Sequence, residues 1–396
     1  NDAKEESVNT ILEMAEYKKT GSCKVLVVTG CMAQRYKNEI IEEVPEVDAV
    51  LGTTSYGDIL KAIREAMEGK HFQEFKDIDY LPEKLGKRVL TTGGHFGYLK
   101  IAEGCDKHCT YCIIPKLRGK FRSVPMERLV TQAKEMAEEG VKELILVAQE
   151  TTVYGTDIYG KKSLHILLKE LCKIKGIRWI RVLYCYPEEI YDELIQTMKE
   201  EKKICHYLDL PIQHASDRIL KRMGRRTTQA ELVEIVNKLR REIPDIVLRT
   251  TLISGFPGET QEDHEELMSF VDEMEFDRLG VFTYSPEEDT PAATMPDQVA
   301  EEVKEARRDE IMELQQEISY DKGTDRIGQE LLVMIEGKVA DESAYIGRTY
   351  GDAPKVDGYI FVQTGELLMT GDFAKVRVTG ALEYDLIGEL ADEYTE

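Results

Sequence analysis

A strand-then-helix pattern repeats between residues 98 and 284 and constrains the fold more than any other feature. Short apolar runs predict strands at Tyr98–Ala102, Glu143–Ala148, Ile177–Tyr184, Tyr207–Pro211, Val247–Ser254 and Arg278–Tyr284. Amphipathic segments between them predict helices near residues 125–139, 163–173, 187–200, 228–241 and 260–274. Strands that alternate with helices pair in parallel, so the pattern predicts an α/β fold, a partial (βα)6 TIM-like barrel. Barrels of this kind carry their chemistry at the carboxyl ends of the strands.

Two smaller domains are expected on either side of this pattern. Before it, helices near 3–19, 34–43 and 56–68 alternate with strand candidates at residues 25–28 and 47–51, which indicates a small Rossmann-like α/β domain. Residues 70–95 are polar and lack a clear period, so they are expected to form a linker. After a charged helix near 297–320, short alternating segments predict a small all-β, OB-like barrel. The expected domains span residues 1–85, 91–321 and 324–396.

The first residues resemble the cap and first turn of a helix. Asn1 offers a capping side chain, and acidic residues follow it near the positive end of the helix dipole. A domain seldom begins on a helix cap. We therefore expect that the N-terminal domain is truncated and that an upstream strand precedes Asn1.

Charge and cysteine content limit the possible partners and the compartment. The 396 residues carry a net charge of −23, which should repel nucleic acid and favour a basic partner. The apolar runs are too short to span a bilayer, and the start lacks a basic-then-apolar signal, so no membrane association is expected. Eight cysteines are too few for a disulfide scaffold of this length. These features predict a cytoplasmic protein with reduced thiols.

Three of the eight cysteines lie together directly after the first predicted barrel strand. Cys105, Cys109 and Cys112 are separated by three and then two residues. Such tight spacing allows three thiolates to converge on one inorganic site. Zinc usually takes four ligands, and His108 lies between the cysteines, where binding would need a strained loop. Three thiolates would instead leave one iron of a four-iron cluster open to a small molecule, while structural zinc or buried thiols remain the alternative.

This spacing, with Tyr111 before the last cysteine, resembles the signature of radical S-adenosylmethionine (SAM) enzymes. The resemblance implies that Cys105, Cys109 and Cys112 hold a [4Fe–4S] cluster and that Tyr111 lies at the cofactor. It further implies that the open iron binds the amino and carboxylate groups of SAM. An electron from the cluster would then cleave SAM to a 5′-deoxyadenosyl radical, which abstracts hydrogen from an unactivated carbon.

Residues 28–36, Val-Thr-Gly-Cys-Met-Ala-Gln-Arg-Tyr, resemble the end of the N-terminal domain of methylthiotransferases within that family. In those enzymes three cysteines of this domain hold a second [4Fe–4S] cluster. Cys31 matches the last of the three, and the other two would lie upstream of Asn1. The resemblance therefore implies two clusters in the full-length protein, of which only the Cys105–Cys112 cluster is complete in this chain. A buried thiol is the alternative for Cys31.

Segments 148–155, 207–216 and 352–358 resemble the branch that modifies a ribosomal protein (RimO-type), and the resemblance extends over essentially the whole chain. Relatives that modify transfer RNA usually carry an Asn-containing first segment and a Ser-Gly in the second. The resemblance implies an enzyme that adds a methylthio group to the β-carbon of a conserved aspartate in the decoding-centre small-subunit protein uS12. SAM would serve twice, as methyl donor and as radical source. Flavodoxin or ferredoxin would supply electrons.

Residues near the predicted strand ends are candidates for contacts with SAM. Gln149 and Gln213 follow two strands, and Gly255 and Gly258 form a turn after the fifth. Their alternatives are strand-end caps and an ordinary βα turn. Arg249 lies within a strand, where it either faces the lumen and pairs with a carboxylate or forms a salt bridge to the helix layer.

The C-terminal barrel helps to choose between targets. The family calls this module a TRAM domain and associates it with RNA, which would favour methylthiolation of a transfer-RNA adenosine as the alternative function. Acidic residues, however, outnumber basic ones in residues 325–396, which suits a basic ribosomal protein better than phosphate. We expect Asp341, Glu342, Asp352 and Asp357 to face that partner. Two further alternatives remain. The basic run 221–226 could make a secondary contact with RNA, and the whole protein could be an electron carrier without enzymatic activity.

Overall fold

The computed structural model describes residues 2–81, 89–340 and 343–391. These residues divide into two compact units. Unit 1 comprises Asn1–Val89, Glu103–Arg122 and Ser285–Thr294. Unit 2 comprises Leu90–Ala102, Ser123–Tyr284 and Met295–Glu396. The domain boundaries expected from the sequence divide the chain differently and stay a prediction.

Unit 1 contains a three-stranded parallel sheet with the order β1-β2-β3. Its elements before the cysteines are α1 (Asp2–Thr20), β1 (Val27–Thr29), α2 (Cys31–Tyr36), α3 (Glu39–Glu43), β2 (Ala49–Leu51), α4 (Ile59–Met67) and β3 (Phe72–Glu74). Buried Val28, Ala33, Ile40, Val47 and Val50 form its core. The Rossmann-like α/β expectation for this part of the chain is confirmed.

Two sequence expectations for unit 1 are wrong. The helix expected over 34–43 is two helices, because the backbone of Lys37 adopts a left-handed φ of 45° that ends α2. The expected linker 70–95 contains β3, whose three residues pair in parallel with β2. A strand of three residues is too short to show an alternating pattern, so only its pairing partner identifies it. Residues 82–88 of that linker lie outside the described residues.

The six-stranded sheet of unit 2 confirms the partial (βα)6 barrel. All of its strands are parallel, in the order β11-β10-β9-β8-β7-β4. The strands are β4 (Phe96–Lys100), β7 (Glu143–Val147), β8 (Trp179–Val182), β9 (Ile204–Asp209), β10 (Val247–Ser254) and β11 (Arg278–Thr283). Short β5 (Ala102–Glu103) and β6 (Arg122–Ser123) form a separate two-stranded sheet.

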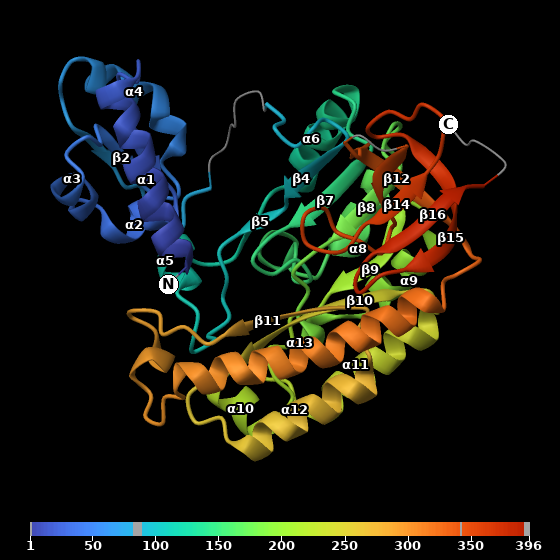
Figure 1. Ribbon diagram of the computed structural model, residues 1–396. Coiled ribbons are helices and arrows are strands. Elements are labelled where there is room, and N and C mark those ends of the chain that lie inside the picture. Colours follow the sequence, from blue (N-terminus) through green and yellow to red (C-terminus); the bar gives the residue numbers. More distant parts are fainter. Residues whose placement is uncertain (1, 82–88, 341–342, 392–396) are drawn as a thin grey trace. The chain divides into compact units, whose positions relative to one another are not determined.

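The helices of unit 2 are α6 (Met126–Glu138), α7 (Thr156–Tyr159), α8 (Leu164–Cys172), α9 (Asp192–Glu200), α10 (Asp217–Arg222), α11 (Gln229–Glu242), α12 (Gln261–Met274) and α13 (Glu301–Thr324). Capping boxes start α11 at Thr228 and α12 at Thr260, which explains why sequence places both starts well. In Figure 1, α12 and α13 lie side by side next to the strands β10 and β11. Within the described ranges, no helix is long and apolar enough to cross a membrane.

The last part of unit 2 is a closed all-β barrel with the order β12-β13-β14-β16-β15. Its strands are β12 (Glu330–Lys338), β13 (Ala344–Arg348), β14 (Ile360–Gln363), β15 (Phe373–Ala381) and β16 (Leu386–Leu390). Ten buried residues fill its interior, among them Val333, Ile360 and Val376. The expected small all-β barrel is confirmed.

A second hydrophobic core joins this barrel to the six-stranded sheet. Phe96, Trp179, Tyr207 and Val247 of the sheet pack with residues of the C-terminal part: Met334, Ala353 and Phe373. The ring of Trp179 meets the edge of Phe373 at a centroid distance of 4.8 Å. The barrel therefore completes the sheet's core.

Buried ion pairs cross the same junction. The fully buried Glu143 accepts hydrogen bonds from Arg181 Nε at 2.8 Å and from Arg348 Nη2 at 2.7 Å. Asp352 pairs with Arg278 at 2.6 Å, and Asp357 with Arg249 at 3.3 Å. The expectation that Asp352 and Asp357 face a protein partner is thus wrong, because their side chains are 4% and 3% exposed and already paired. Asp341 and Glu342 lie outside the described residues.

Candidate active site

The cysteine motif lies on a loop of unit 1 between β5 and the short helix α5 (Ile114–Arg118). Gly104 enters the loop with a left-handed φ of 75°, and a Cβ there would lie 2.0 Å from the Lys120 carbonyl oxygen. Only glycine fits such a close approach of two backbone segments. The amide of Cys105 donates to the Gly119 carbonyl oxygen at 3.1 Å, which closes the loop at its base.

The three cysteines of this loop are thiols, as are all eight in the chain. Cys105 and Cys109 are buried and Cys112 is half-buried. The Lys107 amide donates to Cys105 Sγ at 3.4 Å, and burial raises the pKa of Cys112. Three soft sulfur donors within eight residues fit an iron–sulfur cluster better than a hard cation.

The side chains of the loop are not arranged around a common point. Within the described residues, no three Cys, His, Asp or Glu side chains converge closely enough to hold a metal ion. Convergence of Cys105, Cys109 and Cys112 therefore stays a prediction, as does the cofactor contact of Tyr111, which is half-buried.

Cys31 belongs to the same compact unit as the cysteine loop. It is the half-buried first residue of α2, directly after β1 and Gly30. Helix α2 packs against α5, which begins two residues after Cys112. Unit 1 thus holds all four cysteines predicted as cluster ligands.

The remaining predicted site residues lie in unit 2, four of them after parallel strands and Arg249 within β10. Gln149 follows β7, and its Oε1 atom is buried without a hydrogen-bond partner among the described residues. Gln213 follows β9 and has a left-handed φ of 73°, rare for a residue with a side chain. Its amide donates to the Thr251 carbonyl oxygen and its carbonyl oxygen accepts from Ile253, at 2.9 and 2.8 Å, so β10 holds this strained backbone in place.

Gly255 and Gly258 form the turn after β10, with left-handed φ values of 68° and 84°. A Cβ at Gly255 would lie 2.1 Å from Cγ of Lys304, and one at Gly258 would lie 2.9 Å from Arg222. The need for glycine at both positions therefore follows from backbone conformation and packing. Whether the turn also contacts SAM stays a prediction.

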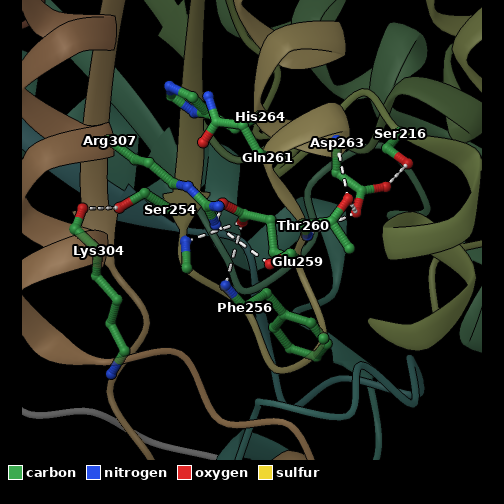
Figure 2. Close-up of polar contacts among 12 residues, drawn as sticks. Ser216, Ser254, Phe256, Glu259, Thr260, Gln261, Asp263, His264, Lys304 and Arg307 are labelled. Carbon is green, nitrogen blue, oxygen red and sulfur yellow. Dashed lines mark hydrogen bonds and ion pairs between the residues drawn. The ribbon is translucent and has the colours of Figure 1, made fainter.

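Glu259 organises this turn and escaped the sequence analysis. As Figure 2 shows, its carboxylate faces the turn. Oε2 accepts from the amides of Gly255 at 2.8 Å and Phe256 at 3.2 Å, and Oε1 accepts from Arg307 Nη1 at 2.8 Å. His214 Nε2 lies 3.4 Å from the same carboxylate. The sequence signal for this role is the position of Glu259, a carboxylate directly after Gly-Phe-Pro-Gly and at the start of a predicted helix, where backbone amides need acceptors.

Arg249 pairs with carboxylates and not with the helix layer, whereas its place in the lumen stays a prediction. Its Nη1 donates to Asp209 Oδ1 at 2.8 Å, and its Nε lies 3.3 Å from Asp357 Oδ1. Asp209 ends β9, and Asp357 lies between β13 and β14, so the partners are carboxylates and neither belongs to the helix layer. Asp209 also accepts from the amide of Tyr184, a residue with a left-handed φ of 58° that is 48% exposed.

Comparisons with known proteins identify the parts of the chain. Residues 99–271 match the radical SAM superfamily, residues 327–391 the TRAM domain, and residues 1–52 an uncharacterised protein family, UPF0004. The cobalamin-dependent SAM radical enzyme OxsB is a structural neighbour, with a TM-score of 0.47 and 15% identity, covering 80% of this chain and 46% of that chain.

Curated relatives match almost the whole chain. A protein of Lachnoclostridium phytofermentans named ribosomal protein uS12 methylthiotransferase RimO is 66% identical over 98% of this chain and 88% of its own length. A Clostridium perfringens protein of the same name is 53% identical over 99% and 87%. The chain therefore belongs to the RimO family of ribosomal protein uS12 methylthiotransferases.

Proposed function

We propose that this chain is a radical-SAM enzyme that methylthiolates ribosomal protein uS12 at the β-carbon of a conserved aspartate. The observation that carries the proposal is the Cys105-x3-Cys109-x2-Cys112 loop within a chain that is 66% identical to a relative named for this activity. The β-hydrogen of an aspartate is not acidic enough for an ordinary base, so its removal needs radical chemistry.

The radical SAM superfamily implies a [4Fe–4S] cluster and SAM, which together supply a radical when bound. We propose that Cys105, Cys109 and Cys112 hold this cluster, with Tyr111 beside it. We further propose that Cys31 is one of three ligands of a second cluster. The SAM contacts that we propose are Gln149, Gln213, Arg249, Gly255 and Gly258.

The geometry of unit 2 supports two of these contacts in particular. Oε1 of Gln149 is buried and has no partner in the part of the chain that the structure describes; its desolvation is costly unless a donor reaches it, such as the amino group of SAM. The left-handed backbone of Gln213 is held from both sides by β10, so its side chain is presented from a rigid position. Glu259 holds the Gly255–Gly258 turn in a fixed shape before any ligand binds.

The proposed partner is the basic ribosomal protein itself, attracted by the acidic surface of a chain with a net charge of −23. Exposed acids of the C-terminal barrel that could face it are Glu366, Glu383 and Glu389. RNA contact is secondary in this proposal. Flavodoxin or ferredoxin supplies electrons, the enzyme acts in the cytoplasm, and its domains follow the boundaries 1–85, 91–321 and 324–396.

The decisive test is mass spectrometry of uS12 and of bulk transfer RNA after co-expression with the full-length enzyme. We expect a methylthiolated aspartate peptide with wild type and none with Cys109→Ala. A modified transfer-RNA adenosine with unmodified uS12 would instead establish the alternative function. Lysine substitution of Glu366, Glu383 and Glu389 should weaken uS12 binding, more at low than at high salt.

A further inference from the structure

A ten-residue segment, residues 285–294, leaves the fold of unit 2 and packs with unit 1. The chain enters it from β11 and returns through Met295 towards α13, yet Ser285–Thr294 groups with unit 1. We call this segment the strap. It ends in a short 3-10 turn at Pro291–Thr294.

One side of the strap binds the helix that begins at Cys31. Arg35 on α2 donates from Nη2 to the Glu288 carbonyl oxygen at 2.9 Å and forms an ion pair with Glu287. The hydroxyl of Tyr36 donates to Glu288 Oε2 at 3.3 Å. The Arg35 side chain is only 14% exposed, and burial opposes its charge, but the Glu287 carboxylate outweighs burial and raises the pKa of Arg35.

The other side of the strap binds the cysteine loop. The amide of Ala292 donates to the carbonyl oxygen of Thr110, which lies between Cys109 and Cys112. Lys116, on the helix that follows Cys112, donates from Nζ to the Asp289 carbonyl oxygen at 2.7 Å. Ten residues therefore contact both the helix of Cys31 and the loop of the other three cysteines.

We propose that the strap is a positioning element that holds the Cys31 helix and the cysteine loop at one fixed separation, with Arg35 as its principal positioning residue. The inference rests on the proposed function, in which sulfur delivery and hydrogen abstraction must act on one substrate carbon. A misplacement of about 1 Å can cost about a hundredfold in rate. In the proposed function, SAM cleavage does not require the Cys31 helix, whereas methylthio transfer requires both the Cys31 helix and the cysteine loop. Loss of the strap contacts should therefore reduce methylthio transfer much more than SAM cleavage.

The test compares Arg35→Gln with wild type in the full-length, cluster-loaded protein. Hydrogen exchange, followed by mass spectrometry, should show that the amides of residues 31–36 and 285–294 exchange about tenfold faster in the variant. The variant lacks the charged hydrogen bonds of Arg35, so local opening of these segments costs less free energy. The ratio of methylthiolated uS12 to 5′-deoxyadenosine should fall about tenfold or more, since geometry controls transfer. The control is Arg64→Gln, which removes an exposed arginine from α4 of the same unit and should change neither readout.

A charge exchange separates pairing from loss of structure. The double variant Arg35→Glu with Glu287→Arg should recover part of the exchange protection and of the transfer ratio that each single variant loses. Unchanged exchange in Arg35→Gln would overturn the proposal. Faster exchange with an unchanged ratio would also overturn it, because the strap would then be structural only. If wild type left uS12 unmodified, the proposed function would fail, while the exchange data would still report on the strap.

Discussion

Replacing Glu143 by glutamine should destabilise unit 2 severely. The side chains of Glu143, Arg181 and Arg348 are all 0% exposed. Without the Glu143 charge, Arg348 keeps its ion pair with Glu336 at 2.6 Å, but Arg181 is left with a neutral acceptor, the Tyr350 carbonyl oxygen at 2.6 Å from its Nη1. Leaving one buried charge without its counter-ion costs about 3–5 kcal/mol. That is a large fraction of the roughly 5–15 kcal/mol that stabilises a typical domain.

The chain contains its own reporter for this measurement. Trp179 is the single tryptophan and lies on β8 within the core shared by the sheet and the C-terminal barrel. Its fluorescence during urea unfolding therefore follows unit 2 even if unit 1 unfolds separately. The control is Glu330→Gln, which removes an ion pair with Arg377 whose partners are 46% and 42% exposed, and should cost at most about 0.5 kcal/mol.

A loss below about 1 kcal/mol in Glu143→Gln would refute the reasoning, because buried charges would then not need compensation here. A second variant, Glu143→Met with Arg181→Met, should recover most of the lost stability, since apolar groups of similar volume can replace a buried pair.

Burial raises the pKa of Glu143, but Arg181 and Arg348 outweigh this effect, and the pKa of Glu143 lies below its usual value. The Glu143 carboxylate therefore stabilises the folded protein fully above about pH 4.3, the pKa of a glutamate in the unfolded chain. This stabilisation is lost as the pH falls through the lower pKa that Glu143 has in the folded protein.

Three further predictions concern the turns and the cysteine loop. Gly104→Ala should lower iron binding markedly, because its Cβ would lie 2.0 Å from the Lys120 carbonyl oxygen; iron analysis after reconstitution measures this. Asp263→Asn should destabilise the protein at neutral pH and progressively less as the pH falls towards 2, because burial is outweighed by Arg218 and the pKa of Asp263 falls to about 2. Cys109→Ala should abolish both iron binding and 5′-deoxyadenosine formation, since a cluster with two thiolates is released or degraded.

Matched substitutions keep these predictions specific. Gly57→Ala is the control for Gly104, because a Cβ at Gly57 has no heavy atom within 4 Å. Cys172→Ala on α8 removes a buried thiol and should leave the iron content unchanged. Normal iron in Gly104→Ala, or a stability difference for Asp263→Asn that is as large at pH 2 as at neutral pH, would contradict the corresponding prediction.

Elements with strong local signals were predictable from sequence. The starts of α11 and α12 carry capping boxes, and the strands of the six-stranded sheet are apolar runs with clear ends. The cysteine loop was visible because its residues are close in sequence. Strand β3 and the break between α2 and α3 have no such signal. Strand β3 is defined only by its pairing with β2, and the break depends on the left-handed backbone of one residue, Lys37.

The electrostatic arrangement was not predictable, because its partners are far apart in the chain. Glu143 and Arg348 come from different sheets and meet only in the folded protein. Asp352 and Asp357 look like surface acids in sequence, yet each is buried and forms an ion pair with a half-buried arginine. Glu259 differs, because its partners Gly255 and Phe256 are its near neighbours in the chain. The backbone amides of this turn need an acceptor, and Glu259 is the nearby carboxylate that supplies one.

The shared core of the sheet and the C-terminal barrel has a consequence for synthesis. Trp179 of the sheet packs against Phe373, which the ribosome adds only after all six strands of the sheet. At a synthesis rate of about 5–20 residues per second, the face of the sheet that packs against the barrel stays uncovered for on the order of ten seconds. A nascent chain stalled before Phe373 would expose aromatic surface to chaperones and aggregation. An enzyme that modifies a ribosomal protein can thus complete its own core only after a ribosome has added the strands of the C-terminal barrel.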